Sequence, residues 1–277
     1  MKATSSTPRA RALAAGLREV REAHGVGLRQ LARILGFAPQ VLSLWEKGLR
    51  LPAVADVALI LGFFHVRGEK QEYLLELART ARERDWVTPG TPEISPELSG
   101  LVECERSATK ITAWACTLIP GILQTPDYAR AILDNSDLTR SQADAHLAMR
   151  LDRQKMLTRP EPVQYRAIIG ERALREPIAG EDIMSDQMDH LLEVAERPHI
   201  SLRVLPAEAG YHPGMLGSFF LYEYEDTPPI ALLEHAYSSA FLHADGHIRS
   251  YLRLAKVLAG RALSEDASRA LIAEAAK

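Results

Sequence analysis

The sequence has only two cysteines, few aromatic residues (6%) and no long apolar run. No stretch approaches the roughly 18 unbroken apolar residues that a membrane helix requires, and the first residues lack the apolar region and cleavage site of a secretory signal. Cys104 and Cys116 match no metal-ligand spacing, so we interpret both as buried small hydrophobes. We therefore expect a soluble, cytoplasmic protein without a disulfide framework.

The common catalytic motifs are also missing. The chain contains no GxSxG, Walker A or GxGxxG sequence, which removes the usual scaffolds for acyl, phosphoryl and hydride transfer. The strongest metal candidate combines His243 and His247 with Glu234 and His235 upstream. Zinc chelation by two histidines at this spacing needs one helix that contains both. Asp245 and Gly246 lie between the two histidines and argue against such a helix. We expect no enzymatic activity, no metal and no cofactor.

Charge is divided unevenly along the chain, although the net charge is only −3. Residues 1–84 carry 14 Lys and Arg against 8 Asp and Glu, whereas residues 85–277 carry 19 against 28. Between them, residues 85–97 contain three prolines and a glycine, which is typical of a linker. The sequence thus predicts a basic domain over residues 1–84, a Pro-rich linker over 85–97 and an acidic domain over 98–277.

The two predicted domains differ in hydrophobic periodicity. Apolar residues recur at helical spacing throughout the first 84 residues, and glycines interrupt them often enough for five short helices. After the linker, short β-branched or alternating runs stand between longer helical stretches, and the predicted fold is α+β. The strand candidates are 110–116, 163–169, 200–205, 218–224 and 230–234; the helix candidates are 96–107, 126–133, 141–157, 181–196 and 245–263, with a short helix at the C-terminus.

Residues 28–47 have the spacing of a helix-turn-helix. Two helices that cross at a steep angle need a small residue at the crossing, and Ala32 is there. Four residues on, the turn requires a left-handed backbone, which Gly36 adopts cheaply. Leu42 and Trp45 then provide the inward face of the second helix, at offsets of ten and thirteen from Ala32. Pro39 suits the first turn of that helix, where its missing N–H costs nothing.

The outward side of this second helix provides candidate DNA contacts. Docking in a major groove would present Gln40, which can pair with adenine, and Ser43, which can bind a base or a phosphate. Val41 and Leu44 can make only apolar contacts, for example to thymine methyl groups. Three cationic residues around this helix are candidates for phosphate binding; they are Arg29, Lys47 and Arg50.

The N-terminal segment, from about Arg11 to Arg84, resembles the lambda-repressor-like, Xre-type helix-turn-helix domains. The remainder resembles the C-terminal domain of the antitoxin-like DUF5753 regulators of actinobacteria. The matching phrases are LIPGILQT at 118–125, DYA at 127–129, RLDRQ at 150–154, AGYHPG at 209–214 and EH at 234–235. The resemblance implies a transcriptional regulator, often paired with a small partner protein encoded beside it.

The chain departs from the Xre pattern in its recognition region. Gly27 and Leu28 replace a polar cap and a phosphate-binding Gln, Ala38 and Pro39 replace a second polar cap and a Gln, and Leu44 stands where Arg is common. We therefore expect weaker or more thymine-directed base discrimination than in typical relatives.

A second candidate site, for a partner or effector, lies in the larger domain. The loop of Ile122, Leu123 and Gln124 follows a predicted strand, with Tyr128 just beyond it. Either these residues line a groove, or Ile122 and Leu123 plug the core. His212 lies in a Gly- and Pro-rich loop, where it faces a pocket or binds loop backbone.

The sequence leads to one reading and two alternatives. We expect a DNA-binding regulator that acts as a homodimer, its operator occupancy set by the second domain. In the first alternative, the second domain is an enzyme or small-molecule receptor that the helix-turn-helix domain merely localises. In the other, the chain is an antitoxin-like protein-binding module with weakened DNA readout.

Overall fold

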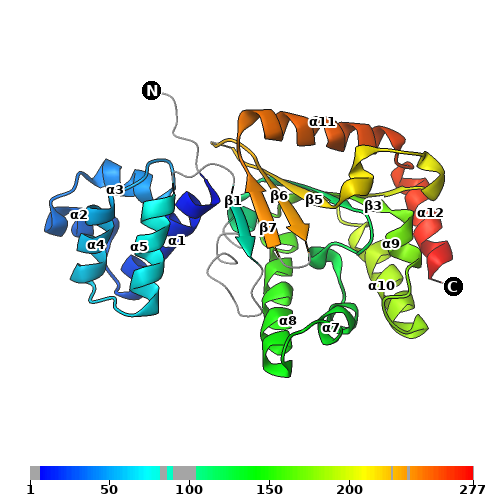
Figure 1. Cartoon of the computed structure of the whole chain (residues 1–277), viewed down its shortest axis with the longest axis horizontal. Coiled ribbons are helices and arrows are strands. Elements are labelled where there is room, and N and C mark those ends of the chain that lie inside the picture. The colour runs from blue at the N-terminus through cyan, green and yellow to red at the C-terminus, as the bar shows by residue number, and fades with distance from the viewer. Residues whose placement is uncertain (1–6, 82–85, 90–103, 226, 236–237, 277) are drawn as a thin grey trace.

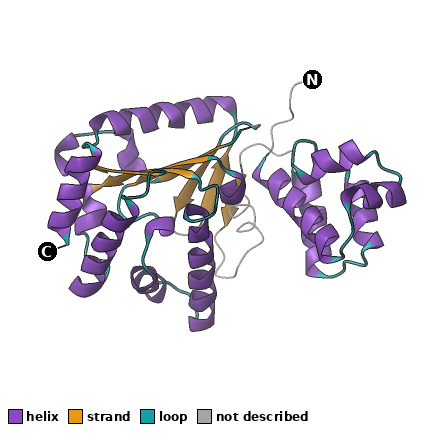
Figure 2. Cartoon of the chain, turned by 180° about the vertical axis from the view of Figure 1, so that it is seen from behind, coloured by secondary structure: helices purple, strands orange, loops and turns teal. Residues whose placement is uncertain are grey.

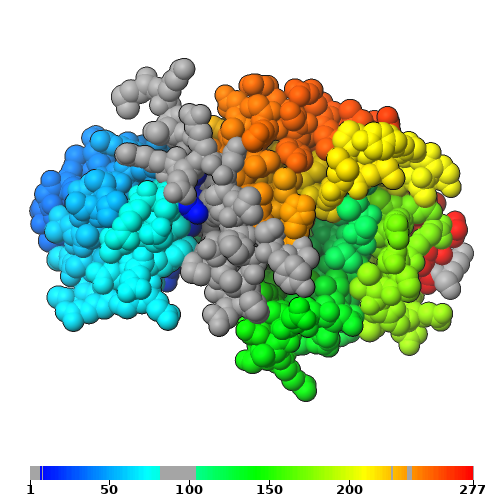
Figure 3. Space-filling view, viewed as in Figure 1, coloured from blue at the N-terminus to red at the C-terminus, as the bar shows by residue number. Residues whose placement is uncertain are grey.

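The computed structural model of the chain describes residues 7–81, 86–89, 104–225, 227–235 and 238–276. These residues form a helical N-terminal part and a C-terminal part with one sheet between helices, as Figure 1 shows. In the space-filling view the two parts lie at opposite ends of the molecule (Figure 3). The predicted division into an all-α domain and an α+β domain is confirmed.

The N-terminal part consists of the five helices that the periodicity predicts. Their bounds are α1 Pro8–Ala23, α2 Leu28–Leu35, α3 Pro39–Glu46, α4 Val54–Phe63 and α5 Glu69–Thr80. Helices this short are marginal alone, so their stability comes from one shared apolar core. The largest fully buried side chains in that core are Leu13, Leu17, Leu31, Leu42, Ile60, Leu61 and Leu74.

The C-terminal part is built on a mixed sheet in the order β1-β7-β6-β5-β2-β3-β4. Three strands, β2, β3 and β4, run parallel, and the other pairings are antiparallel. The bounds are β1 Trp86–Pro89, β2 Lys110–Ala115, β3 Gln164–Gly170, β4 Ile200–Leu205, β5 Phe219–Glu223, β6 Ile230–His235 and β7 Ser238–Leu242.

Helices cover the two faces of this sheet unequally. Helix α11 (Asp245–Arg261) crosses one face, and the remaining helices lie on the other, as the view from behind shows (Figure 2). These are α7 Pro126–Asp134, α8 Arg140–Gln154, α9 Glu171–Arg175, α10 Glu181–Val194 and α12 Glu265–Ala275. Side chains of successive strand residues point to opposite faces, so Ile111 and Ala113 join the larger core and Trp114 packs beneath α11.

One prediction about this part needs correction, and one strand was missed. Residues 86–89 of the expected linker form β1, which pairs with β7 at the edge of the sheet. Strand β7 itself was not predicted, because its sequence SSAFL is short and does not alternate. The remaining linker residues from 90 onward, and most of the helix expected at 96–107, lie outside the described residues.

One arginine connects the two parts. The guanidinium of Arg11 in α1 donates hydrogen bonds to the hydroxyls of Ser107 (2.9 Å) and Thr227, and lies 3.5 Å from the centre of the Tyr224 ring. Its side chain is buried despite its charge. Both terminal nitrogens of the guanidinium are paired, although its Nε has no hydrogen-bond partner among the described residues, and these contacts fix α1 against the end of β5.

Candidate nucleic-acid interface

The turn between α2 and α3 has the geometry that its sequence predicts. Gly36 ends α2 in a left-handed conformation (φ 75°, ψ 19°), and its N–H donates to the carbonyl of Ala32. Ala32 is completely buried, which allows α3 to approach α2 closely. The predicted crossing residue and the predicted turn glycine are therefore both confirmed.

Helix α3 is held from behind by its apolar side. Leu42 is fully buried and Trp45 is 5% exposed. The Trp45 ring meets Phe37 edge to face, with 4.9 Å between ring centres. These contacts leave the opposite side of α3 facing outward.

An ion pair that the sequence did not reveal fixes the end of α3. Glu46 is buried and accepts two hydrogen bonds of 2.7 Å from Arg21 in α1. Arg18 donates to the carbonyl oxygen of the same glutamate. The hydrogen bonds to Glu46 raise the pKa of Arg21 above its usual value. Because α1 grips the last turn of α3, the angle at which α3 projects is set by both helices.

The structure places the predicted DNA contacts unequally. Gln40, Lys47, Arg50 and Arg29 are exposed, whereas Ser43 and Leu44 are half-buried. Val41 is also half-buried and packs against the helical core. Its side chain therefore has less surface to offer a duplex than the sequence suggested.

Among the described residues, the cations at this surface have no acidic partners. None of the described ion pairs involves Arg29, Lys47 or Arg50. The exposed Arg33 of α2, which was not among the predicted DNA contacts, is also absent from these ion pairs. Unpaired positive charge beside an exposed helix is what a phosphate backbone attracts. Neither α2 nor α3 has a side-chain cap, as the Gly27 and Ala38 departures predicted.

Comparison with known families agrees with this geometry. A helix-turn-helix family model matches residues 17–70, and a model described as a domain of unknown function, DUF5753, matches residues 98–274. The second match covers more than half of the chain. The chain belongs to the DUF5753 family. No curated protein and no solved structure matches it at a significant level. The helix-turn-helix match supports a DNA-binding regulator.

The predicted partner site in the DUF5753 domain is interior. Ile122 and Leu123 are buried in its main core, so they plug the core and do not line a groove. Gln124 is also buried and donates to the carbonyl of Ile119 (2.7 Å). Tyr128 is completely buried, and burial raises its pKa. The structure thus corrects the groove interpretation, because each of these side chains is enclosed by protein.

His212 is interior as well. It is 6% exposed and meets Trp114 edge to face at 5.4 Å between ring centres. Trp114 donates to the carbonyl of Gly214 (2.8 Å), which fastens this loop to the sheet. Burial lowers the pKa of His212, because desolvation disfavours the charged ring. The histidine therefore packs its loop against the sheet through Trp114.

A polar network ties together two of the phrases that mark the DUF5753 domain, LIPGILQT and RLDRQ. Arg150 donates to the side-chain oxygen of Gln124 (2.6 Å), and Gln154 donates to the Gln124 carbonyl (2.7 Å). Arg153 binds the buried Glu105 through two hydrogen bonds of 2.6 Å. Burial lowers the pKa of Arg150, because desolvation disfavours its charged form. These contacts span segments far apart in sequence, and spacing alone could not reveal them.

The described residues hold no group of three or more His, Cys, Asp or Glu side chains placed to bind a metal ion. Cys104 and Cys116 are free thiols. Within the described part of the chain, no helix has the length and apolar character needed to cross a bilayer.

Proposed function

We propose that the protein is a sequence-specific transcriptional regulator that acts on double-stranded DNA in the cytoplasm. The observation that carries this proposal is the exposed side of α3, where Gln40 and Lys47 are exposed while Leu42 and Trp45 anchor the helix from behind. Gln40 would read a base edge, and Lys47, Arg50 and Arg29 would hold phosphates. Ser43, Leu44 and the partly exposed Val41 would contribute smaller contacts.

We propose that two copies act together. One α3 of eight residues reads only a few base pairs. A homodimer would place two such helices in successive major grooves about 34 Å apart, which multiplies the discrimination available to each.

The DUF5753 domain would set operator occupancy through a protein partner or an effector, and it would have no enzymatic activity and no cofactor. Three observations support this role. Arg11 couples α1 to this domain, and Lys47 lines a cleft of about 510 Å³ shared with it. Four exposed large apolar residues also lie on α11 or in the loop that contacts it, which suits contact with a small partner protein. They are Tyr211, Met215, Leu216 and Val257.

Genome-wide capture of DNA bound by the full chain tests the proposal. The wild-type chain should enrich a discrete set of sites that share a motif. Gln40→Ala should retain DNA but relax the motif at one position, because a bidentate base contact is lost. Arg50→Ala should weaken capture at all sites alike. Capture without a shared motif would contradict sequence-specific regulation.

The half-buried Leu44 and the missing caps favour one rival, an antitoxin-like module whose helix no longer discriminates between sequences. It predicts equal affinity for a captured site and a shuffled duplex at every salt concentration. Turnover by the full chain, lost on substitution of a residue in the DUF5753 domain, would instead support the enzyme alternative.

A further inference from the structure

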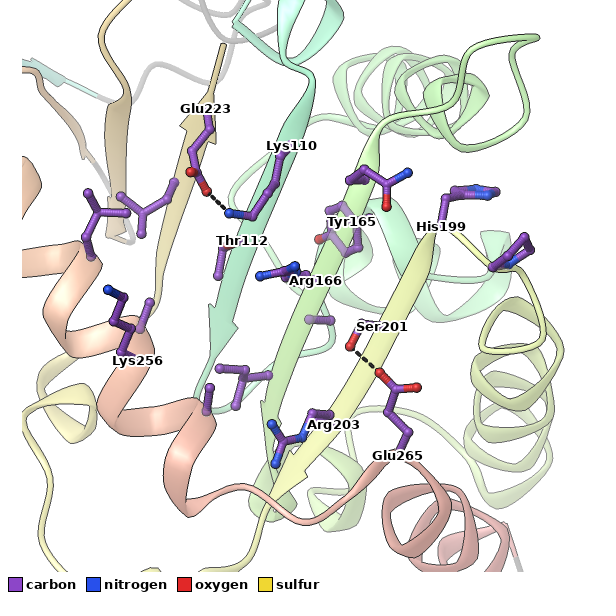
Figure 4. A pocket seen from close by; sticks show the side chains of 18 residues that line it. Lys110, Thr112, Tyr165, Arg166, His199, Ser201, Arg203, Glu223, Lys256 and Glu265 are labelled. Atoms are coloured by element: carbon purple, nitrogen blue, oxygen red, sulfur yellow. Dashed lines mark hydrogen bonds and ion pairs between the residues drawn. The ribbon is translucent and has the colours of Figure 1, made fainter. Parts of the chain in front are cut away.

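The face of the sheet beneath α11 is only partly covered. Helix α11 packs over the second halves of the parallel strands, where Trp114, Ile168 and Leu205 meet Ile248 and Leu258. In front of the first halves lies a cavity of about 480 Å³ (Figure 4). This volume is in the range of small-molecule sites in proteins.

The cavity floor changes from polar to apolar along the strands. Register places Thr112, Arg166 and Ser201 side by side on β2, β3 and β4. Leu221 continues this row on β5, and Ile168 stands in the next row. The wall on the α11 side adds Leu252, Ala255 and Ala259. A ligand with one polar end and one apolar body would match this floor.

Most charged groups around the cavity are already engaged. Lys110 pairs with Glu223 at 2.5 Å, and the Ser201 hydroxyl donates to Glu265 at 2.5 Å. Arg203 donates to the carbonyls of residues 262 and 263. These contacts fix the rim but leave its cationic excess uncompensated, with four Lys and Arg against two Glu.

Two cations of the cavity remain unengaged. Arg166 on the central strand β3 and Lys256 on α11 take part in none of the described hydrogen bonds or ion pairs, and both line the cavity. Arg166 points from β3 toward Thr112 and away from Glu265, and Lys256 stands across the cavity on α11 (Figure 4). A planar guanidinium and an ammonium that line one cavity from a strand and a helix suit an oxyanion, which the guanidinium can bind through two parallel hydrogen bonds.

We infer that this cavity binds a small amphipathic molecule with one oxyanionic group, a carboxylate or a phosphate. Arg166 and Lys256 bind the oxyanion, the Thr112 hydroxyl donates a further hydrogen bond, and the apolar body lies over Ile168, Leu221 and Leu252. This site would give the DUF5753 domain its effector, and in that respect the inference rests on the proposed function. Because α11 forms one wall and packs on the sheet, an occupant would contact both layers of the domain.

Titration of the full chain with three related probes tests the site. The probes are 1-naphthyl phosphate, 1-naphthoate and the neutral 1-naphthylmethanol, followed by calorimetry at fixed salt. At least one anionic probe should bind with a Kd below about 1 mM, and the neutral probe should bind at least tenfold more weakly. Whichever anion binds more tightly identifies the head group. Equal binding of neutral and anionic probes, or no saturable binding, would overturn the inference.

Substitutions then locate the binding. Arg166→Ala and Lys256→Ala should each weaken the anionic probe about tenfold, the effect expected for one charge-assisted hydrogen bond. Arg249→Ala is the matched control, since it removes an exposed charge from α11 outside the cavity, and it should change binding less than twofold. Arg50→Ala should also leave binding unchanged, which excludes uptake on the DNA-binding surface. An effect of the controls equal to that of Arg166→Ala would contradict the assignment.

Affinity for a captured duplex, measured with and without the anionic probe, separates the proposed DNA-binding function from the proposed anion site. If the chain binds no specific duplex but the probe results hold, the proposed function fails and the site stands. If the duplex binds specifically but Arg166→Ala and Lys256→Ala leave probe binding unchanged, the site is wrong and the regulator stands.

Discussion

The turn glycine of the helix-turn-helix offers a test in which two Gly→Ala substitutions have opposite signs. Gly36 has φ 75°, and a Cβ added there would meet no atom within 4 Å. The cost of Gly36→Ala is therefore conformational, about 1–2 kcal/mol for a left-handed L-residue. A smaller gain of about 0.4–1 kcal/mol, from lower entropy of the unfolded chain, offsets part of it. The net expected loss is about 1 kcal/mol.

Gly62 in α4 is the matched control. It is exposed, helical and equally free of neighbours, so Gly62→Ala should stabilise the domain by about 0.5–1 kcal/mol. Hydrogen exchange of peptides that span residues 28–46 measures both effects, and 1 kcal/mol corresponds to about a fivefold change in protection. Gly36→Asn should lose less than Gly36→Ala, because Asn tolerates the left-handed region. A shift of the same sign for Gly36→Ala and Gly62→Ala would refute this account of the turn.

Two further predictions concern buried charge. Glu46→Ala should lower the free energy of unfolding, measured in urea, by about 3 kcal/mol, because it leaves Arg21 partly buried without an acidic partner. Adding Arg21→Ala should recover part of this loss. A loss below about 1 kcal/mol for Glu46→Ala would contradict the role of this ion pair. His212 and His190 have lowered pKa values in the folded chain, so the unfolded chain binds protons first as pH falls. Their contribution to stability is complete above the unfolded pKa of about 6.5 and declines below it. The melting temperature should therefore fall as the pH is lowered from 7 to 5.5, and His212→Gln should reduce this fall. A larger fall in the variant would contradict the lowered pKa of His212.

The helix-turn-helix could be predicted from the sequence because its constraints are local. Ala32, Gly36, Leu42 and Trp45 lie within fourteen residues, and each position is fixed by the crossing of two adjacent helices. The partner of Glu46 escaped this reasoning, since Arg21 lies on a different helix. Spacing on α3 alone gives no sign that its last residue points inward.

The DUF5753 domain was predictable in its elements but not in its site. Strand runs such as 200–205 appear in the structure with the predicted bounds, because alternation and β-branched residues mark them locally. Whether Ile122, Gln124 or His212 faces solvent depends on the elements that fold over them, and the structure encloses all three. The Arg166 cavity was missed for the same reason, since its floor is a row across four strands.

The central claim is that the outer side of α3 reads DNA, and the salt dependence of binding tests it most directly. Affinity of the full chain for a captured duplex and for a shuffled duplex would be followed by fluorescence anisotropy between about 50 and 200 mM salt. Gln40→Ala should reduce the preference for the captured duplex without changing the slope of log affinity against log salt. Arg50→Ala should lower the magnitude of that slope by about one. Arg67→Ala removes an exposed cation outside α2 and α3 and should leave both quantities nearly unchanged. Equal affinity for the two duplexes, or equal effects of Arg50→Ala and Arg67→Ala, would contradict the account.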